Sequence, residues 1–311
     1  MKIRPTLILA LVAALAACSN DAPPADSAAI PAAPDELVPV AAPAADPIDA
    51  ILAGSHRSDA NKARDQYRHP KETLAFFGIQ PNMTVIEITP GGGAWYTEIL
   101  APYLRDAGSE VAAIWDTGAS DAPGYYAKNN EQLATKLASD PAAYDRVALR
   151  SFDAKAPAFG EANSADAVVT FRNVHNWTMA GNDGDYFKAV FDVLKPGGVL
   201  GVVEHRANAG TSLEATKETG YLTEDYVIGL ATAAGFILEE KSEINANAND
   251  SKDHPQGVWT LPPSFALKDK DREKYAAIGE SDRMTLRFRK PSESADGDAS
   301  DDTAAQPAAG D

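Results

Sequence analysis

The sequence MTVIEITPGGGAWYTEILAPYL, residues 83–104, decides the fold, because an apolar run is followed by a glycine cluster and then by a helical pattern. Val85, Ile86 and Ile88 are β-branched residues of the kind that fill buried parallel strands. The glycines at 91–93 let the chain turn sharply and approach a ligand closely. The stretch therefore predicts a strand, a tight loop and a helix.

A glycine loop that leads into a helix presents free backbone N–H groups at the carboxyl end of a strand, where open α/β sheets bind ligands. The loop has neither the dinucleotide spacing G-x-G-x-x-G nor the phosphate-loop spacing G-x-x-x-x-G-K-[ST]. We therefore expect a nucleotide-like cofactor that is bound in some other way. The alternative is a turn that serves only close packing of a helix on the sheet.

An acidic residue, Glu87, ends the first strand and is followed by Thr89, Gly91 and Gly93. This arrangement resembles the acidic-x-G-x-G-x-G signature of class I S-adenosylmethionine-dependent methyltransferases, with Thr89 in place of the first glycine. The resemblance implies S-adenosylmethionine as cofactor. It assigns the methionine portion to Glu87 and the loop, and it gives Tyr96 or Trp95 an aromatic contact with the sulfonium.

Further marks follow in the order that the family has. Asp116 follows a second predicted strand, residues 110–115, and Asp153 follows a third, residues 146–152. The resemblance places Asp116 on the ribose hydroxyls and Asp153 beside the adenine amino group, with a turn role as the alternative for each. The sequence LKPGG at residues 194–198, before a β-branched strand, is another mark of the family.

The segment YRHPKETL at residues 67–74, taken with the PGGGAWYTEIL loop, resembles a group of predicted bacterial methyltransferases of undefined substrate. The resemblance covers residues 58–290. It implies an α/β protein with a Rossmann-like class I methyltransferase fold, a seven-stranded mostly parallel sheet with helices on both faces. An antiparallel hairpin is expected to close the sheet, and residues 257–279 are expected to cover the substrate face.

The most polar loop reads RNVHNW, residues 172–177, and follows a fourth predicted strand at residues 166–171. In the resembled family this strand end faces the transferable methyl group. The resemblance implies cofactor contact for Arg172 and catalytic roles for Asn173 and His175, with His175 as the first candidate for proton acceptor. Tying down the loop backbone is the alternative for these side chains.

Glu204, His205 and Arg206 end a fifth predicted strand at the same edge of the sheet. His205 is the second candidate for proton acceptor, and a solvated, salt-bridged strand end is the alternative. Arg64 and Arg68 are four residues apart and share a helical face, where they either clamp an anionic group or form an exposed basic surface. The histidines lack metal-ligand spacing, so no metal is predicted.

The N-terminus has the layout of a secretory signal, with basic residues, an apolar stretch and then Cys18. Residues 15–18, LAAC, resemble the bacterial lipobox, in which the cysteine is lipidated. The resemblance implies a signal peptide at residues 1–17 and a periplasmic lipoprotein of the bacterial cell envelope, with Ser19 favouring the outer membrane. An ordinary signal peptide with a chance cysteine is the alternative.

The composition divides the rest of the chain into three parts. Ala and Pro dominate residues 18–50, which predicts a tether, and residues 291–311 hold six acids and no base, which predicts a disordered tail. Residues 51–290 suffice for one methyltransferase-like domain. Because Cys18 is the only cysteine, the stability of this domain must come from its core.

The chain is strongly acidic, with 28 basic and 45 acidic residues and a net charge of −17. Removal of the signal takes away two bases and no acid, which leaves −19. Such a surface argues against nucleic acid or anionic membrane as the main partner. The expected partners are a small-molecule substrate and a lipid anchor, and the sequence does not indicate an oligomeric state.

These observations lead to the hypothesis of S-adenosylmethionine-dependent methyl transfer to an unidentified small-molecule or envelope substrate. Its site is expected to be one pocket shared by the glycine amides, Glu87 and Asp116. Export opposes the hypothesis, because S-adenosylmethionine is made in the cytosol. The alternative is a catalytically inactive methyltransferase-like ligand-binding lipoprotein. An exported Rossmann oxidoreductase is a third hypothesis, weakened by the glycine spacing.

Overall fold

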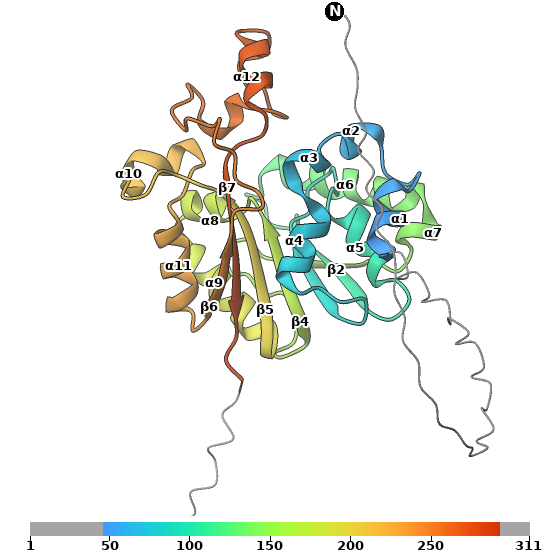
Figure 1. Ribbon diagram of the computed structural model, residues 1–311. Coiled ribbons are helices and arrows are strands. Elements are labelled where there is room, and N and C mark those ends of the chain that lie inside the picture. Colours follow the sequence, from blue (N-terminus) through green and yellow to red (C-terminus); the bar gives the residue numbers. More distant parts are fainter. Residues whose placement is uncertain (1–45, 293–311) are drawn as a thin grey trace, which may run out of the picture. The chain divides into compact units, whose positions relative to one another are not determined.

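Seven strands form one sheet in the order β3-β2-β1-β4-β5-β7-β6. The computed structural model describes residues 46–292 (Figure 1). The signal peptide, Cys18, most of the expected tether and the tail beyond residue 292 lie outside the described residues. The strands are β1 (Thr84–Ile88), β2 (Ser109–Trp115), β3 (Ala148–Phe152), β4 (Ala165–Phe171), β5 (Leu194–His205), β6 (Ile237–Ser242) and β7 (Arg283–Arg289).

The strands β1 to β5 pair in parallel, while β7 pairs antiparallel with both β5 and β6. This topology confirms the expected seven-stranded, mostly parallel sheet and its closing hairpin. Because β1 lies between β2 and β4, the loops after these three strands meet at one edge of the sheet. We call it the carboxyl edge.

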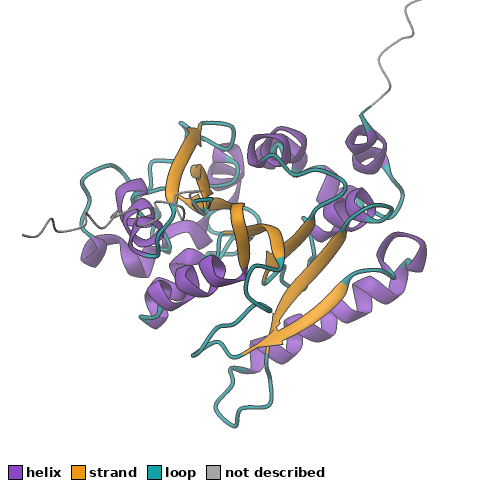
Figure 2. Ribbon diagram, turned by 90° about the horizontal axis from the view of Figure 1, so that it is seen from below, coloured by secondary structure: helices purple, strands orange, loops and turns teal. Residues whose placement is uncertain are grey.

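Helices cover both faces of the sheet, which explains why β1 and β4 are apolar on both sides (Figure 2). Each face has its own core. One face carries α1 (Pro47–Ala53), α4 (Pro70–Phe77), α5 (Thr97–Leu104), α6 (Gly124–Ser139) and α7 (Pro141–Tyr144), and the other carries α8 (Val174–Ala180), α9 (Asp183–Val193) and α11 (Glu224–Ala233).

The remaining helices are short and gather toward the carboxyl edge (Figure 1). The structure divides the helical stretch expected to hold Arg64 and Arg68 on one face into two short helices. Ser58 caps the first piece, and Arg57 binds both carboxylate oxygens of Asp65 at the start of the second. The short helices are α2 (Asp59–Lys62), α3 (Asp65–Arg68), α10 (Leu213–Thr216), η1 (Lys217–Thr219), η2 (Gly257–Thr260) and α12 (Arg272–Ile278).

Three boundaries differ from the sequence predictions. The helix α1 begins at Pro47, inside the stretch predicted as tether, because Asp46 caps it by accepting from the N–H of Ile48. The loop RNVHNW becomes helical from Val174, so His175 lies in the first turn of α8. The LKPGG turn is part of β5, with a register shift opposite β4. Within residues 46–292, no helix has the length and hydrophobicity needed to cross a membrane.

The packing of α4 on β5 gives a test of the core. A Cβ atom added at Gly201 would lie 2.6 Å from the buried ring of Phe77. We expect Gly201→Ala to lower the free energy of unfolding by about 1–3 kcal/mol, the usual cost of overpacking a filled core. Urea denaturation measures this change.

Gly229→Ala is the matched control. Gly229 is exposed in the middle of α11, and no atom lies within 4 Å of the position of an added Cβ. Alanine there should stabilise the protein by up to about 1 kcal/mol through helix propensity. Equal effects of the two substitutions would contradict the packing that we describe.

Candidate active site

The glycine loop joins β1 to α5 at the carboxyl edge. Thr89 and Gly91 both have positive φ, 45° and 71°, so the loop needs glycine at 91 and strains the backbone at 89. The N–H of Gly92 donates to Asn129 Oδ1 at 3.1 Å, and a Cβ at Gly92 would lie 2.1 Å from Gln132. The loop is therefore packed against α6, and one of its backbone amides donates a hydrogen bond to a side chain of that helix.

Glu87 lies in the interior, where it was expected to hold the cofactor. It is 2% exposed and accepts from Thr97 Oγ1 at 2.7 Å, and it does not line either of the cavities described below. Burial raises the pKa of Glu87 to about 7, against the hydrogen bond from Thr97. Burial and then the charge of Glu87 raise the pKa of Glu110 well above its usual value, so Glu110 keeps its proton.

One cavity at the carboxyl edge, the aromatic cavity, has a volume of about 420 Å³. The rings of Trp115 and Tyr126 stack at 4.5 Å, and those of Trp177 and Tyr186 stack at 4.4 Å. Flat aromatic walls of this kind suit a planar heterocycle. The aromatic cavity is lined by the rings of Trp115, Tyr125, Tyr126, Trp177 and Tyr186 and by the polar side chains of Thr89, Asn129, Asn173, Asn176 and Asn182.

Asp116 and Asp153 follow β2 and β3 as predicted, yet neither lines the aromatic cavity. Both carboxylates are exposed and accept from the backbone two residues on, Asp116 from Gly118 at 2.8 Å and Asp153 from Lys155 at 2.8 Å. These are Asx turns, the alternative that the sequence left open. The single pocket expected to join Glu87, the glycine amides and Asp116 is therefore not formed.

A second cavity, the basic cavity, has a volume of about 380 Å³. Trp259, Pro262, Pro263 and Ser264 form part of its wall, which confirms that the segment after residue 257 covers this face. Asn176 lines both cavities, so the two are neighbours at the carboxyl edge. The side chains that give the basic cavity its chemistry are Arg64, Arg68, Trp95, Arg172, His175, His205, Trp259, Glu280 and Ser281.

The candidate catalytic residues are divided between the cavities. His175 and His205 line the basic cavity, with ring centroids 5.2 Å apart, while Asn173 lines the aromatic cavity. The amide of Asn173 donates to Ile88 O at 2.9 Å and so ties the end of β4 to the end of β1. The alternative role in fixing the backbone thus applies to Asn173.

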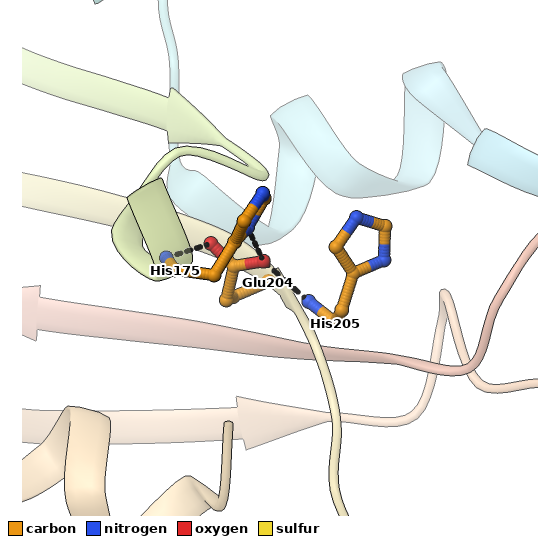
Figure 3. Close-up of side chains that lie close together, drawn as sticks. All are labelled: His175, Glu204 and His205. Carbon is orange, nitrogen blue, oxygen red and sulfur yellow. Dashed lines mark hydrogen bonds and ion pairs between the residues drawn. The ribbon is translucent and has the colours of Figure 1, made fainter. Parts of the chain in front are cut away.

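Glu204 holds His175 in one orientation (Figure 3). The Glu204 side chain is fully buried, and its oxygens accept from His175 Nδ1 at 2.9 Å, from the His175 backbone N–H at 3.2 Å and from the His205 backbone N–H at 2.7 Å. As a carboxylate, Glu204 accepts from all three groups, which assigns the ring proton of His175 to Nδ1. The other ring nitrogen, Nε2, points away from Glu204 and is free to accept a proton.

The same three residues offer one ligand atom each within 4.8 Å, a grouping that the sequence prediction of no metal did not anticipate. Two features oppose a cation here. The oxygens of Glu204 are occupied by N–H groups. Burial first, and then His175 and the neighbouring arginines, lower the pKa of His205 well below 6.5, and the positive charge of those arginines opposes a further cation. The arrangement suits neutral imidazoles that face an anion or a proton donor.

Tyr96 and Arg172 have different surroundings. Tyr96 is buried outside both cavities, where its ring stacks on Phe171 with centroids 3.4 Å apart. Arg172 has a positive φ of 61° and lines the basic cavity. Of the loop residues expected to touch the cofactor, Gly93 lines the basic cavity and Thr89 the aromatic cavity, while Gly91 lines neither.

Sequence reasoning missed Glu280 and Ser281 as cavity residues. They precede β7, which runs antiparallel to its neighbours, so the start of β7 lies at the carboxyl edge. Ser281 Oγ lies 2.5 Å from Nδ1 of His205. The predicted closing hairpin could have revealed both residues. A last strand that runs antiparallel begins at the edge where the parallel strands end, so the residues just before it lie at that edge.

No protein-family model matches this sequence, and no curated protein is significantly similar to it. Solved structures resemble its fold. The [4+2]-cyclase SpnF is 17% identical, with 79% of this chain and 93% of that chain covered and a TM-score of 0.52. A SAM-dependent methyltransferase from Aquifex aeolicus is 14% identical, with 73% of this chain and 93% of that chain covered and a TM-score of 0.47. Another from Methanosarcina mazei is 16% identical, with 71% of this chain and 98% of that chain covered and a TM-score of 0.48.

The fold is therefore the Rossmann-like class I methyltransferase fold that the sequence predicted. Identities this low carry no information about the reaction. The structure with the highest of the three TM-scores is named as a cyclase, so the reaction has to be argued from the residues of the site.

The Glu87–Glu110 pair gives a pH test. A raised folded-state pKa means that the contribution of the pair to stability is present below the unfolded value of 4.5 and is lost as the pH rises, for Glu87 through about 7. We expect Glu110→Gln, which keeps the shape of the side chain but cannot ionise, to be more stable than the wild type at pH 8 by about 1–3 kcal/mol. The gap should shrink at pH 5.

Denaturation by urea at both pH values measures this difference. Glu131→Gln, an exposed substitution on α6, serves as the control and should follow the wild type at both values. If Glu110→Gln destabilised the protein equally at pH 5 and pH 8, the raised pKa values of Glu87 and Glu110 would be disproved.

Proposed function

We propose that this chain transfers a methyl group from S-adenosylmethionine to a small acceptor molecule. One observation carries the proposal: an aromatic cavity and a basic cavity lie next to each other at the carboxyl edge and have Asn176 in common. An extended ligand with a planar base at one end and charged groups at the other matches this division. The glycine loop contributes Thr89 to one cavity and Gly93 to the other.

The residues of the aromatic cavity fit an adenosyl group. Within residues 46–292, Thr89 Oγ1 and Asn182 Oδ1 are buried and have no hydrogen-bond partner, and both residues line this cavity. Buried polar atoms are normally satisfied, so an unsatisfied pair in a cavity indicates a ligand with complementary groups. An amino group on a stacked base would satisfy Asn182 Oδ1, and a hydroxyl would satisfy Thr89 Oγ1.

When bound there, S-adenosylmethionine supplies a methyl group on a positively charged sulfur, open to displacement by an oxygen, nitrogen or carbon nucleophile. The protein contributes position and a proton acceptor. His175 Nε2 faces away from Glu204 and receives the proton that the acceptor atom loses. Glu204 acts through His175 as a positioning residue, because its carboxylate stabilises the imidazolium that forms. His205 remains the second candidate for this role.

The alternative, a ligand-binding domain without catalysis, has its own supporting observations. Glu87 is buried in the interior and bound to Thr97, and the N–H of Gly92 is bound to Asn129. A cofactor site usually keeps such groups available. Both functions require an adenosine-like or anionic ligand, and they differ in whether the ligand is S-adenosylmethionine.

Cofactor binding can be tested by calorimetry on the folded chain with S-adenosylmethionine and S-adenosylhomocysteine. We expect saturable binding of both by the wild type. Tyr126→Ala removes a stacking wall of the aromatic cavity. It should weaken binding by about tenfold or more, since stacking on an aromatic side chain contributes about 1–3 kcal/mol per base.

Lys128→Ala is the control on the same helix, because Lys128 is exposed and does not line the aromatic cavity. Its affinity should match that of the wild type. Asp116→Ala in the same titration decides the proposed ribose contact, which unchanged affinity would reject. A wild-type protein that binds neither cofactor form, but is folded, would favour the binding domain without catalysis.

The cellular compartment is part of the proposal. The signal at residues 1–17 and the lipobox-like cysteine support an envelope lipoprotein that carries this domain. We expect the wild type to incorporate labelled palmitate and to sediment with bacterial membranes, whereas Cys18→Ala should remain unlabelled. Label retained in the Cys18→Ala protein, or wild-type protein confined to the cytosol, would refute the lipid anchor.

A further inference from the structure

The basic cavity combines a high density of arginines with a shortage of acids. Arg64, Arg68 and Arg172 line it, and Glu280 is the acid among its lining residues. Glu280 is shared, since it accepts from Arg64 Nε at 2.6 Å, from Arg68 Nε at 3.1 Å and from Arg283 Nη2 at 2.8 Å. Burial opposes its ionisation, but Arg283, Arg68 and Arg64 lower the pKa of Glu280 to about 2.

The other acid near this cavity is Glu204, and its oxygens are bound by the N–H groups of His175 and His205. The three lining arginines and Arg283, which binds Glu280, thus outnumber the carboxylates of Glu280 and Glu204. The whole chain has a net charge of −17, so this excess of positive charge is local. Positive charge concentrated in a partly buried cavity attracts anions and repels metal cations.

Two of the lining arginines have buried hydrogen-bond donors that lack acceptors. Across the described part of the chain, Nη1 of Arg68 and Nη1 of Arg172 are buried and find no partner. Arg68 is only 2% exposed, and its guanidinium lies over the ring of Trp95 at 4.7 Å, which fixes its plane. Burial and mutual repulsion lower the pKa of both arginines. A bound oxyanion would relieve the repulsion and satisfy both donors.

We propose that the basic cavity binds the oxyanion group, carboxylate or phosphate, of the molecule that accepts the methyl group. This inference rests on the proposed function and narrows its substrate to small acidic compounds. Arg68 and Arg172 hold the oxyanion, His175 and His205 face the bound molecule, and Trp259 covers it from the segment after residue 257. The wall shared at Asn176 places the acceptor next to the aromatic cavity.

The test uses isothermal titration with inorganic phosphate and with malonate, at constant ionic strength and in the presence of EDTA. We expect saturable one-to-one binding by the wild type. Arg172→Gln should weaken it by about tenfold or more, because it removes a charge-assisted donor. The variant should fold, and its melting temperature without ligand should equal or exceed that of the wild type, because the buried Nη1 of Arg172 has no partner to lose among residues 46–292.

Arg150→Gln is the matched control. It removes an arginine from the exposed strand β3, outside the basic cavity, and should keep the wild-type affinity for both anions. The absence of saturable binding to the wild type would overturn the proposal, as would equal weakening by the two variants. Binding that is measured in a parallel titration without EDTA and disappears with EDTA would place a metal at the histidines and would also overturn it.

A second titration tests whether the arginines bind the oxyanion of the acceptor or the carboxylate of the cofactor. It compares S-adenosylhomocysteine, which has a carboxylate, with 5′-methylthioadenosine, which has none. If the cavity serves the acceptor, Arg172→Gln leaves the affinity for both nucleosides unchanged. A loss of affinity for S-adenosylhomocysteine alone would assign the arginines to the cofactor and overturn the inference. If wild-type protein binds phosphate and malonate but neither nucleoside, the methyltransferase proposal fails while the anion site stands.

Discussion

The parallel pairing of β1 with β2 and β4 is the constraint on which the site depends. Parallel neighbours end at the same edge of the sheet, so residues that are distant in the sequence become adjacent there. The amide of Asn173 shows how close this approach is, since it reaches the carbonyl of Ile88 across the strand ends. The cavities occupy the space that remains above these ends, and their walls come from whichever loops leave them.

The two cavities differ because they lie over different strands. The aromatic one follows β2 and β3 and takes its rings from the end of β2 and from α6, α8 and α9. The basic one follows β4 and β5 and takes its arginines from α3, from the residue before α3 and from the loop after β4. An uncharged ring system and a compact anion are thus separated by the architecture of the sheet. Chemistry is possible where they meet, near Asn176 and His175.

The fold was readable from the sequence because its signals are local: β-branched strands, a glycine turn, and LKPGG before β5. The positions of His175, His205 and Arg172 followed from strand ends alone. The surroundings of Glu87 did not, because its burial depends on a second acid, Glu110, that a strand pattern presents as one more residue. Glu280 was missed for a similar reason. Its partners Arg64 and Arg68 lie more than 200 positions away, and pairing over such a separation leaves no periodic trace in the sequence.

That separation has a consequence for synthesis. Glu280 joins Arg64 and Arg68, near the beginning of the described chain, to Arg283, near its end. A nascent chain that stops before the last strand can pair β1, β2 and β4, yet it lacks the counter-ion that lets these arginines stay buried. The arginine cluster of the basic cavity therefore reaches its final arrangement only when β7 has joined the sheet.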